Sequence, residues 1–362
     1  MGRRLIIAGG GTGGHIFPAL AIAGALKSLA PDTEILFVGA RGKMEMEKIP
    51  QAGFTIRGLD IAGFNRSSLI KNAGLPIKLL RSFMQVRSII REFRPDAVIG
   101  VGGYSSFPVL RYAQARGIPT FIHESNSFAG KSNILLGRKA RAIFVASEGM
   151  EKFFPADRIL VTGNPVRKAI VQSAVTRTEA AQAFSLDPAG RTVLFVGGSL
   201  GAKSINEAVD HHLDWLLQQG LQLIWQTGKP YGDLARLRVA GKKGVWTGEF
   251  INRMELAYGA ADIVVSRAGA MAIAELCVVK KPVIFVPYPY AAEDHQTVNA
   301  QHLVSRQAAL MVKDSEADEK LAAMLVELSR DEALRQNLVR QIGTMARTDA
   351  DRLIAQKILD LI

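Results

Sequence analysis

The chain has 362 residues, of which 48% are hydrophobic, and it contains one cysteine, Cys277. This length exceeds the usual size of a single hydrophobic core, so two domains are expected. One cysteine excludes an internal disulfide and any metal site built from several cysteines. The sequence has no apolar run of about 18 residues, and its start predicts a strand and a glycine turn instead of a signal peptide. We therefore expect a cytoplasmic protein with two sizeable cores.

The positive charge is concentrated in the first part of the chain. The net charge is +12, and residues 1–163 hold 22 Lys and Arg against 11 Asp and Glu, whereas residues 164–362 hold 23 against 22. A basic half of this kind favours an anionic substrate, an anionic membrane surface or nucleic acid. Because no zinc-ligand spacing and no aromatic-interleaved basic patch accompanies the charge, no nucleic-acid partner is expected.

Short apolar runs alternate with segments of helical period along the chain. The first part contains LIIAG, EILFVGA, DAVIGVGG, TFIHE, AIFVAS and RILVTGNP, and the opening pattern returns at residue 191 in RTVLFVGGSLGAKSINEA. This alternation predicts an α/β protein with two doubly wound parallel sheets. We place the domains at residues 1–163 and 164–342. The amphipathic end of the chain, residues 343–362, is expected to pack back on the first domain.

The first glycine turn, GGGTGGH, follows the first predicted strand. Its Gly9, Gly11 and Gly14 match the G-x-G-x-x-G pattern of dinucleotide-binding turns. The acidic residue that would bind the ribose of NAD is missing after the second strand, but Arg41 there suits the 2′-phosphate of NADP. An NADP-dependent oxidoreductase therefore stays open, as does a turn that only packs strand against helix. Packing alone does not explain His15 at the mouth of the strand.

Polar residues also follow strands predicted farther along the chain. GGSLGAKSINE repeats the order of strand, glycine turn and helix start, and its Ser199 and Lys203 suit a phosphate. In SRAGAMAIAEL, Glu275 lies about two helical turns after the strand, where a carboxylate can accept both hydroxyls of a ribose. PYPYAAEDHQTVNA contains Gln296, whose amide can donate to and accept from sugar hydroxyls. Each of these residues, taken alone, also fits an ordinary solvated helix.

Seven motifs in order resemble the peptidoglycan N-acetylglucosaminyltransferase family: GGGTGGH, GVGGYSSFP, HESN, GNPVR, GGSLGA, SRAGA and DHQTVNA. The resemblance covers nearly the whole chain. It implies the GT-B fold, in which two Rossmann-like domains face a central cleft. It also implies an inverting hexosyltransferase, which moves GlcNAc from UDP-GlcNAc to the C4 hydroxyl of MurNAc in undecaprenyl-diphospho-MurNAc-pentapeptide (lipid I) and so forms lipid II for peptidoglycan synthesis.

The resemblance also implies roles for individual residues. The residues implied to contact UDP-GlcNAc are Thr12, Gly13, Gly14, Asn126, Arg167, Ser199, Ile251, Ala270, Met271, Glu275 and Gln296. The residues implied to contact lipid I are Gly11, Gly13, Gly14 and Tyr104. His15 is the expected general base, and Glu124 in HESN is its support or its rival. No metal or other cofactor is expected, because a helix N-terminus and amide donors can meet the charge on the departing UDP.

A basic and apolar segment of the first domain, residues 68–87, suits a peripheral contact with the anionic cytoplasmic face of the bacterial inner membrane. The residues expected to make this contact are Ile77, Leu80, Phe83, Lys71, Lys78 and Arg81. An ordinary amphipathic helix packed on its own sheet stays open as the alternative. Further partners are expected among proteins of cell-wall synthesis and cell division.

Overall fold

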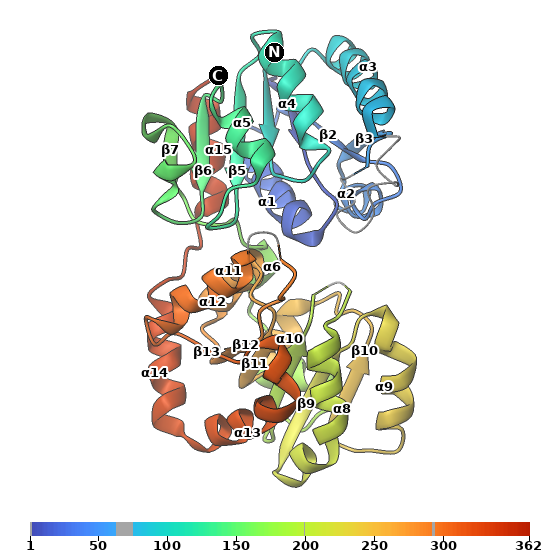
Figure 1. The fold of residues 1–362 in the computed structure, drawn as a ribbon, viewed down its shortest axis with the longest axis vertical. Helices are drawn as coiled ribbons and strands as arrows, with labels where there is room; N and C mark the ends of the chain where they lie inside the picture. Colours follow the sequence, from blue (N-terminus) through green and yellow to red (C-terminus); the bar gives the residue numbers. More distant parts are fainter. Residues whose placement is uncertain (1, 63–74, 199, 292–293) are drawn as a thin grey trace. The chain divides into compact units, whose positions relative to one another are not determined.

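The computed structural model describes residues 2–62, 75–198, 200–291 and 294–362. The chain divides into two compact units, Met1–Arg167 with Arg347–Ile362, and Lys168–Ala346 (Figure 1). These boundaries lie four residues after those predicted from the sequence. Within the described ranges, no helix has the length and apolar character that crossing a bilayer requires.

The first unit is built on a seven-stranded parallel sheet with the order β3-β2-β1-β4-β5-β6-β7. Its strands are β1 (Arg4–Ala8), β2 (Glu34–Ala40), β3 (Thr55–Leu59), β4 (Ala97–Gly100), β5 (Thr120–Glu124), β6 (Ala142–Val145) and β7 (Ile159–Val161). From β1 the chain adds β2 and β3 on one side of the sheet and then crosses to add β4 and the following strands on the other side, so the strand order reverses between β1 and β4. Open α/β sheets bind their ligands at such a switch point, beyond the carboxyl ends of the strands.

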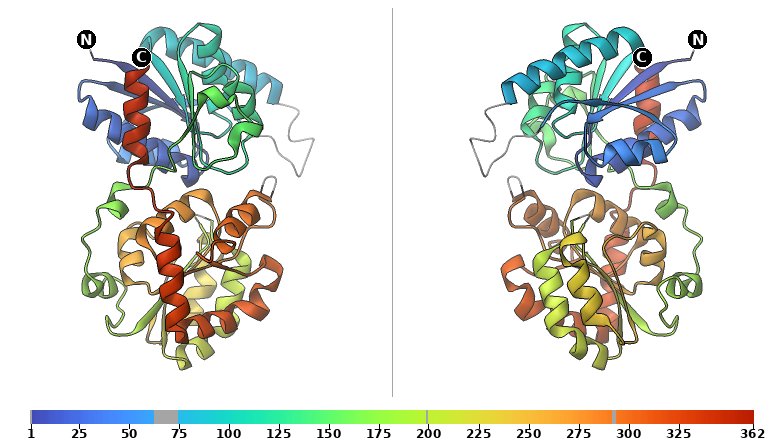
Figure 2. Two further views of the ribbon diagram at one scale, coloured as in Figure 1. Left: turned by 90° about the vertical axis from the view of Figure 1, so that its left-hand side faces the viewer. Right: turned by 90° about the vertical axis from the view of Figure 1, so that its right-hand side faces the viewer.

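Helices cover both faces of this sheet (Figures 1 and 2). They are α1 (Gly13–Leu29), α2 (Glu45–Gln51), α3 (Leu75–Phe93), α4 (Ser106–Ala115), α5 (Lys131–Gly137) and α15 (Ala350–Asp360). Leu5 and Ile7 pack in the core beneath α1 and α15, whereas Ile6 and Ala8 pack in the core beneath α3, α4 and α5. A parallel strand buried on both faces must be apolar throughout, which accounts for the unbroken run in β1.

The second unit repeats this plan with six parallel strands in the order β10-β9-β8-β11-β12-β13. The strands are β8 (Arg191–Val196), β9 (Leu221–Gln226), β10 (Val245–Gly248), β11 (Ile263–Ser266), β12 (Val283–Phe285) and β13 (Leu310–Met311). The helices are α6 (Lys168–Val171), α7 (Arg177–Gln182), α8 (Lys203–Gln218), α9 (Gly232–Val239), α10 (Met254–Ala260), α11 (Ala270–Val279), α12 (His295–Val304), α13 (Ala317–Arg330) and α14 (Glu332–Gly343). The switch point of this sheet lies between β8 and β11.

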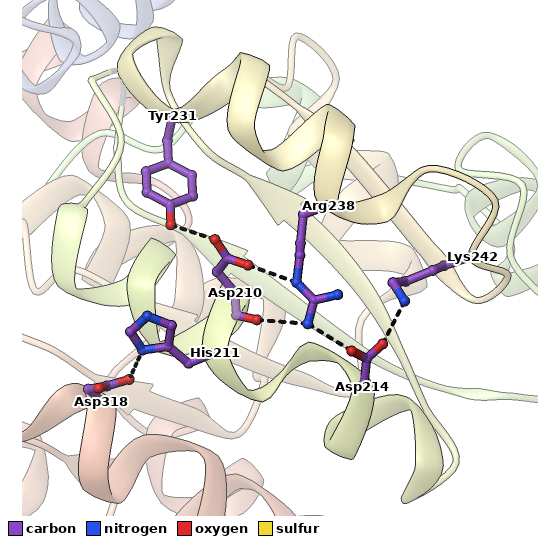
Figure 3. A network of polar contacts seen from close by, with 7 residues as sticks. All are labelled: Asp210, His211, Asp214, Tyr231, Arg238, Lys242 and Asp318. Atoms are coloured by element: carbon purple, nitrogen blue, oxygen red, sulfur yellow. Dashed lines mark hydrogen bonds and ion pairs between the residues drawn. The ribbon is translucent and has the colours of Figure 1, made fainter.

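A polar network on α8 joins the helices of one face of the second sheet (Figure 3). Asp210 accepts from the hydroxyl of Tyr231 at 2.8 Å and from Arg238 at 2.9 Å. His211 pairs with Asp318 of α13 at 2.8 Å. These contacts lie largely at the surface, where single ion pairs contribute at most about 1 kcal/mol each. The apolar core beneath them therefore holds this face together.

Candidate active-site residues in the two units

Two glycine loops meet at the switch point of the first sheet, one after β1 and one after β4. The N–H of Gly10 donates to the carbonyl of Gly102 at 3.3 Å. A Cβ on Gly103 would lie 2.4 Å from the carbonyl oxygen of Gly10, and a Cβ on Gly102 would lie 2.7 Å from the imidazole of His15. Only glycine allows this approach, so the loops pack backbone against backbone and the imidazole of His15 lies directly over Gly102.

His15 is held in one tautomer by the first loop. Its Nδ1 lies 3.0 Å from the carbonyl oxygen of Gly10, and because a carbonyl only accepts, Nδ1 must carry the hydrogen. None of the described residues hydrogen-bonds Nε2, which keeps its lone pair. Burial lowers the pKa of His15 below its usual 6.5, against smaller raising effects of the Gly10 bond and the carboxylates of Glu124 and Glu45. A neutral imidazole with a free lone pair can accept a proton at neutral pH.

Glu124, at the end of β5, is 4% exposed and has both carboxylate oxygens occupied. One oxygen accepts from the backbone N–H and the side-chain amide of Asn126, at 3.1 and 3.3 Å. The other accepts from the N–H of Gly130 at 3.1 Å and from the amide of Asn133 at 2.8 Å. Four donors surround the carboxylate, so this arrangement favours a supporting role of Glu124 in the site. Asn126, expected to contact the sugar, is thereby bonded to Glu124.

The residues expected to contact lipid I gather around the first turn. A Cβ on Gly11 would lie 3.7 Å from the ring of Tyr104. Burial and the Glu45 carboxylate raise the pKa of the Tyr104 hydroxyl above its usual value. Helix α1 starts at Gly13 after Thr12, whose side chain makes no capping bond. Its first N–H groups can therefore serve an anion.

A buried carboxylate that the sequence did not reveal as a site residue, Glu45 of α2, also lies at this turn. It is 1% exposed, and its two oxygens accept from the N–H groups of Gly11 and Ala40 at 2.9 and 3.0 Å. Negative charge at this position disfavours a dinucleotide pyrophosphate on the turn. Arg41, which the NADP alternative requires, pairs instead with Asp60 at 3.0 Å. Both observations count against that alternative.

In the second unit, a buried amide holds the corresponding turn. Gln226, at the end of β9, is 3% exposed and accepts from the N–H of Gly197 at 3.2 Å. Its NH₂ group donates to the carbonyls of Gly198 and Glu249 at 3.0 and 2.8 Å. Ser199, the expected phosphate contact, lies outside the described residues. The turn is thus fixed by a neutral side chain that the sequence did not single out.

Helix α11 carries the residue expected to bind the ribose. Glu275 is 5% exposed, and one of its oxygens accepts from the hydroxyl of Tyr258 at 3.1 Å. The helix begins at Ala270 and Met271, after Gly269, which has no side chain that could cap it. Ile251, in the loop after β10, is buried.

The loops after β11 and β12 are joined by Arg267, which the sequence also did not reveal. Its guanidinium donates to the carbonyls of Val286 and Pro287 at 2.9 and 3.1 Å and pairs with Asp314. Gln296 of α12 accepts from the N–H of Tyr288 at 3.0 Å, which fixes its amide with the NH₂ group remaining as a donor.

The remaining expected contacts of the first unit are Arg167 and the side chains of the basic and apolar segment that includes α3. Arg167 places its guanidinium over the ring of Phe17, 4.7 Å from its centroid. On α3, Ile77 and Leu80 are 60% and 64% exposed beside the exposed Lys78 and Arg81, whereas Phe83 is half-buried. Met84, which we did not expect at the membrane, is 58% exposed. Lys71 lies outside the described residues. Among the residues that are described, no group of three or more His, Cys, Asp or Glu is arranged to hold a metal ion.

Comparisons with known proteins identify the family. Residues 5–145 match the "Glycosyltransferase family 28 N-terminal domain" and residues 192–354 the "Glycosyltransferase family 28 C-terminal domain". A Phocaeicola vulgatus protein named "UDP-N-acetylglucosamine--N-acetylmuramyl-(pentapeptide) pyrophosphoryl-undecaprenol N-acetylglucosamine transferase" is 49% identical over 99% of this chain and 96% of its own. The protein of the same name from Parabacteroides distasonis is 48% identical over 99% and 98%.

A solved structure agrees with these matches. The crystal structure of Acinetobacter baumannii MurG superposes with a TM-score of 0.76 at 28% identity and covers 99% of both chains. Together with the two parallel sheets, this confirms the predicted GT-B fold class. The chain therefore belongs to the same family as the Phocaeicola and Parabacteroides N-acetylglucosamine transferases, within glycosyltransferase family 28.

Proposed function

We infer that this chain is an inverting N-acetylglucosaminyltransferase, which transfers GlcNAc from UDP-GlcNAc to the C4 hydroxyl of MurNAc in lipid I and forms lipid II. The observation that carries this conclusion is the 48–49% identity, over nearly the full length, to transferases of that name. The residues at the two switch points supply chemistry that suits the reaction.

We propose His15 as the general base. Its Nε2 takes the proton of the C4 hydroxyl while the hydroxyl oxygen bonds to C1 of GlcNAc. The bond between C1 and the UDP oxygen breaks, and UDP leaves with the electron pair on the opposite face of the sugar, so the configuration inverts. A neutral imidazole fits this step, and the fixed Nδ1–H aligns the ring. Glu124 supports the site through its hydrogen bonds.

We propose that the second unit binds the donor. The starts of α8 and α11 lie at the switch point of its sheet, where the N-terminal ends of helices favour a diphosphate. Glu275 binds the ribose hydroxyls, the backbone at Ile251 binds the uracil, and the NH₂ group of Gln296 binds a GlcNAc hydroxyl. Helix dipoles and amide donors stabilise the charge on the departing UDP, so no step requires a metal.

We propose that the first unit binds lipid I and docks on the membrane. Gly13, Gly14 and Tyr104 contact the acceptor. Ile77, Leu80 and Met84 form an exposed apolar patch on α3 beside basic side chains, a composition that suits an anionic lipid surface. We place the enzyme peripherally at the cytoplasmic face of the inner membrane, with further partners among cell-wall synthesis and division proteins.

The proposal is tested by product analysis and by ligand-induced stabilisation. Incubation with UDP-GlcNAc and a lipid I analogue should release UDP and yield the β-linked disaccharide product. UDP should also raise the apparent melting temperature, because a ligand that binds only the folded state stabilises it. Stabilisation by NADPH without stabilisation by UDP would contradict the proposal.

A further inference from the structure

We propose that Glu45 is a positioning residue for His15 and acts through the peptide group that joins Gly10 to Gly11. This inference rests on the proposed function, in which His15 is the base. Glu45 itself contacts neither the imidazole nor the reacting hydroxyl in this scheme.

One peptide group connects the carboxylate to the imidazole. Its N–H, which belongs to Gly11, donates to Oε2 of Glu45 at 2.9 Å. Its carbonyl, which belongs to Gly10, accepts from Nδ1–H of His15 at 3.0 Å. Carboxylate, peptide and imidazole thus form a hydrogen-bonded chain, and the hydroxyl oxygen of Thr12 lies farther from the same Nδ1, at 3.5 Å.

The chain has a direction that favours one tautomer of His15. A carboxylate that accepts the N–H of a peptide group polarises it and makes its carbonyl a stronger acceptor. The stronger carbonyl favours hydrogen on Nδ1, which leaves Nε2 unprotonated and able to accept the proton of the substrate. A carboxylate in direct contact with histidine has the same effect in the Ser-His-Asp triad, and here one peptide group stands between the two.

The Glu45 side chain has room at this position because two neighbouring residues are glycines. A Cβ on Gly10 would lie 2.4 Å from its Oε1, and a Cβ on Gly39 would lie 2.6 Å from its Cγ. The same oxygen, Oε1, accepts from the N–H of Ala40 at the end of β2 at 3.0 Å. The Glu45 side chain is therefore hydrogen-bonded to the backbone at the ends of β1 and β2 and packs against two glycines that have no side chain in its way.

Three titratable groups from two elements are electrostatically coupled to His15. Glu45 of α2 and Glu124 of β5 raise the pKa of His15, and His15 in turn lowers the pKa of His123 of β5. The bonds of Glu124 go to Asn126, Gly130 and Asn133 and bypass the first glycine turn. Of these groups, Glu45 is the one bonded to the peptide that holds the imidazole.

The test combines NMR of histidine with kinetics on the full chain. In the wild-type protein, ¹⁵N shifts of His15 should report hydrogen on Nδ1 at neutral pH. In Glu45→Gln, the amide can satisfy Ala40 but presents NH₂ to the N–H of Gly11. The Nδ1–H fraction should fall, and the pKa of His15 should move down because a raising charge is lost.

The kcat for lipid II formation should fall about 10- to 100-fold, as when a hydrogen-bond partner that orients a functional histidine is removed. The acid limb of the pH profile of kcat should move to lower pH.

The matched control is Glu47→Gln, which removes an exposed carboxylate from the same helix. It should leave the tautomer, the pH profile and kcat unchanged. The KM for UDP-GlcNAc should stay within about twofold in both variants, because Glu275, Ile251 and Gln296, which bind the donor in the proposal, belong to the other unit. A Glu45→Gln variant with wild-type tautomer, pH profile and kcat would overturn the proposal.

Two further outcomes keep this proposal separate from the proposed function. If Glu45→Gln does not fold, the NMR measurement of the His15 tautomer in the wild-type protein tests the proposal instead. Hydrogen on Nε2 in that measurement would overturn the role of Glu45. If the wild-type protein makes no lipid II, the transferase assignment fails whatever the tautomer of His15. Normal transfer by the wild type with an unaffected Glu45→Gln variant rejects the positioning role alone.

Discussion

The two glycine turns occupy the same place in two similar sheets but are secured by different side chains. After β1, the N–H of Gly11 is bonded to the carboxylate of Glu45. After β8, the N–H of Gly197 is bonded to the amide of Gln226. One turn therefore carries a buried negative charge and the other does not.

This difference indicates which turn suits a nucleotide. Helix starts and glycine N–H groups attract phosphate in either sheet, but in the first turn the N–H of Gly11 is already bonded to a carboxylate, which disfavours a phosphate at that peptide group. The neutral turn of the second unit is compatible with a diphosphate. The charged turn of the first unit instead suits the orientation of a histidine. A glycine pattern alone could not have separated these roles.

The largest expected effect is that of removing the imidazole at the charged turn. His15→Ala should lower kcat by about 10²- to 10⁴-fold, the usual contribution of a general base. The dissociation constant of UDP should change by less than about twofold, since the proposed donor residues lie in the other unit. Steady-state kinetics and calorimetric titration of UDP on one preparation check both values. A near-normal kcat would exclude His15 as the base.

Introducing a carboxylate at the neutral turn should weaken nucleotide binding. Gln226→Glu should raise the dissociation constant of UDP about 10- to 100-fold, because about 2 kcal/mol of like-charge repulsion is added in a partly buried site. Gln226→Met is the control, since it loses the two bonds that the amide donates, as Glu does, and also the bond accepted from Gly197, without adding charge. Equal UDP affinity in the Met and Glu variants, both shown folded by thermal melting, would count against the role of charge.

Acid should destabilise the first unit through its buried histidines. Burial, and then repulsion from His15, lowers the pKa of His123 to about 4. Between pH 6.5 and about 4 the unfolded chain binds a proton that folded His123 does not, so the free energy of unfolding falls as the pH falls. The slope from one histidine reaches about 1.4 kcal/mol per pH unit.

Denaturant unfolding of His123→Gln at several pH values isolates this contribution from the carboxylates that titrate nearby. The variant should lose less stability than the wild type between pH 6.5 and 4. Parallel curves for the wild type and His123→Gln would reject the prediction.

A smaller effect is expected from the apolar patch on α3. Leu80→Ser should weaken binding to vesicles with anionic lipids about tenfold, the size expected for one partly inserted leucine. Leu237→Ser is the matched control, because Leu237 on α9 of the second unit is 78% exposed. Turnover of a soluble lipid I analogue should be unaffected in both. Equal loss of vesicle binding in the two variants would indicate general surface hydrophobicity instead of a docking face.

The fold followed from the sequence because its signals are local. Apolar runs that end in glycine or polar residues marked the strands of the first sheet except β3, and the repeat at residue 191 marked the start of the second unit. Glu124 and Glu275 could be named as candidates because each follows a strand, and the carboxyl ends of parallel strands share one edge. The sequence did not predict correctly which side chains of α3 face outward. Successive residues of a helix point about 100° apart, so an error of one position exchanges Phe83 for Met84 on the exposed side.

The side chains that secure the turns could not be found in this way. Glu45 bonds Gly11 from 34 residues away, and Gln226 bonds Gly197 from 29 residues away. Such pairs depend on which backbone N–H groups lie within reach once the sheet has formed. Dinucleotide sites have their acidic residue directly at the end of the second strand. Here Glu45 follows the end of β2 by five residues, and this spacing was the signal that the sequence offered for its different role.

The most direct test of the division of roles between the two turns is a crystal structure with UDP-GlcNAc bound. We expect the diphosphate at the second unit, between the Gly197–Gly201 turn and the start of α11, with the ribose on Glu275. The Gly11 N–H should remain bonded to Glu45. A nucleotide bound on the turn after β1, with Glu45 displaced, would contradict this division.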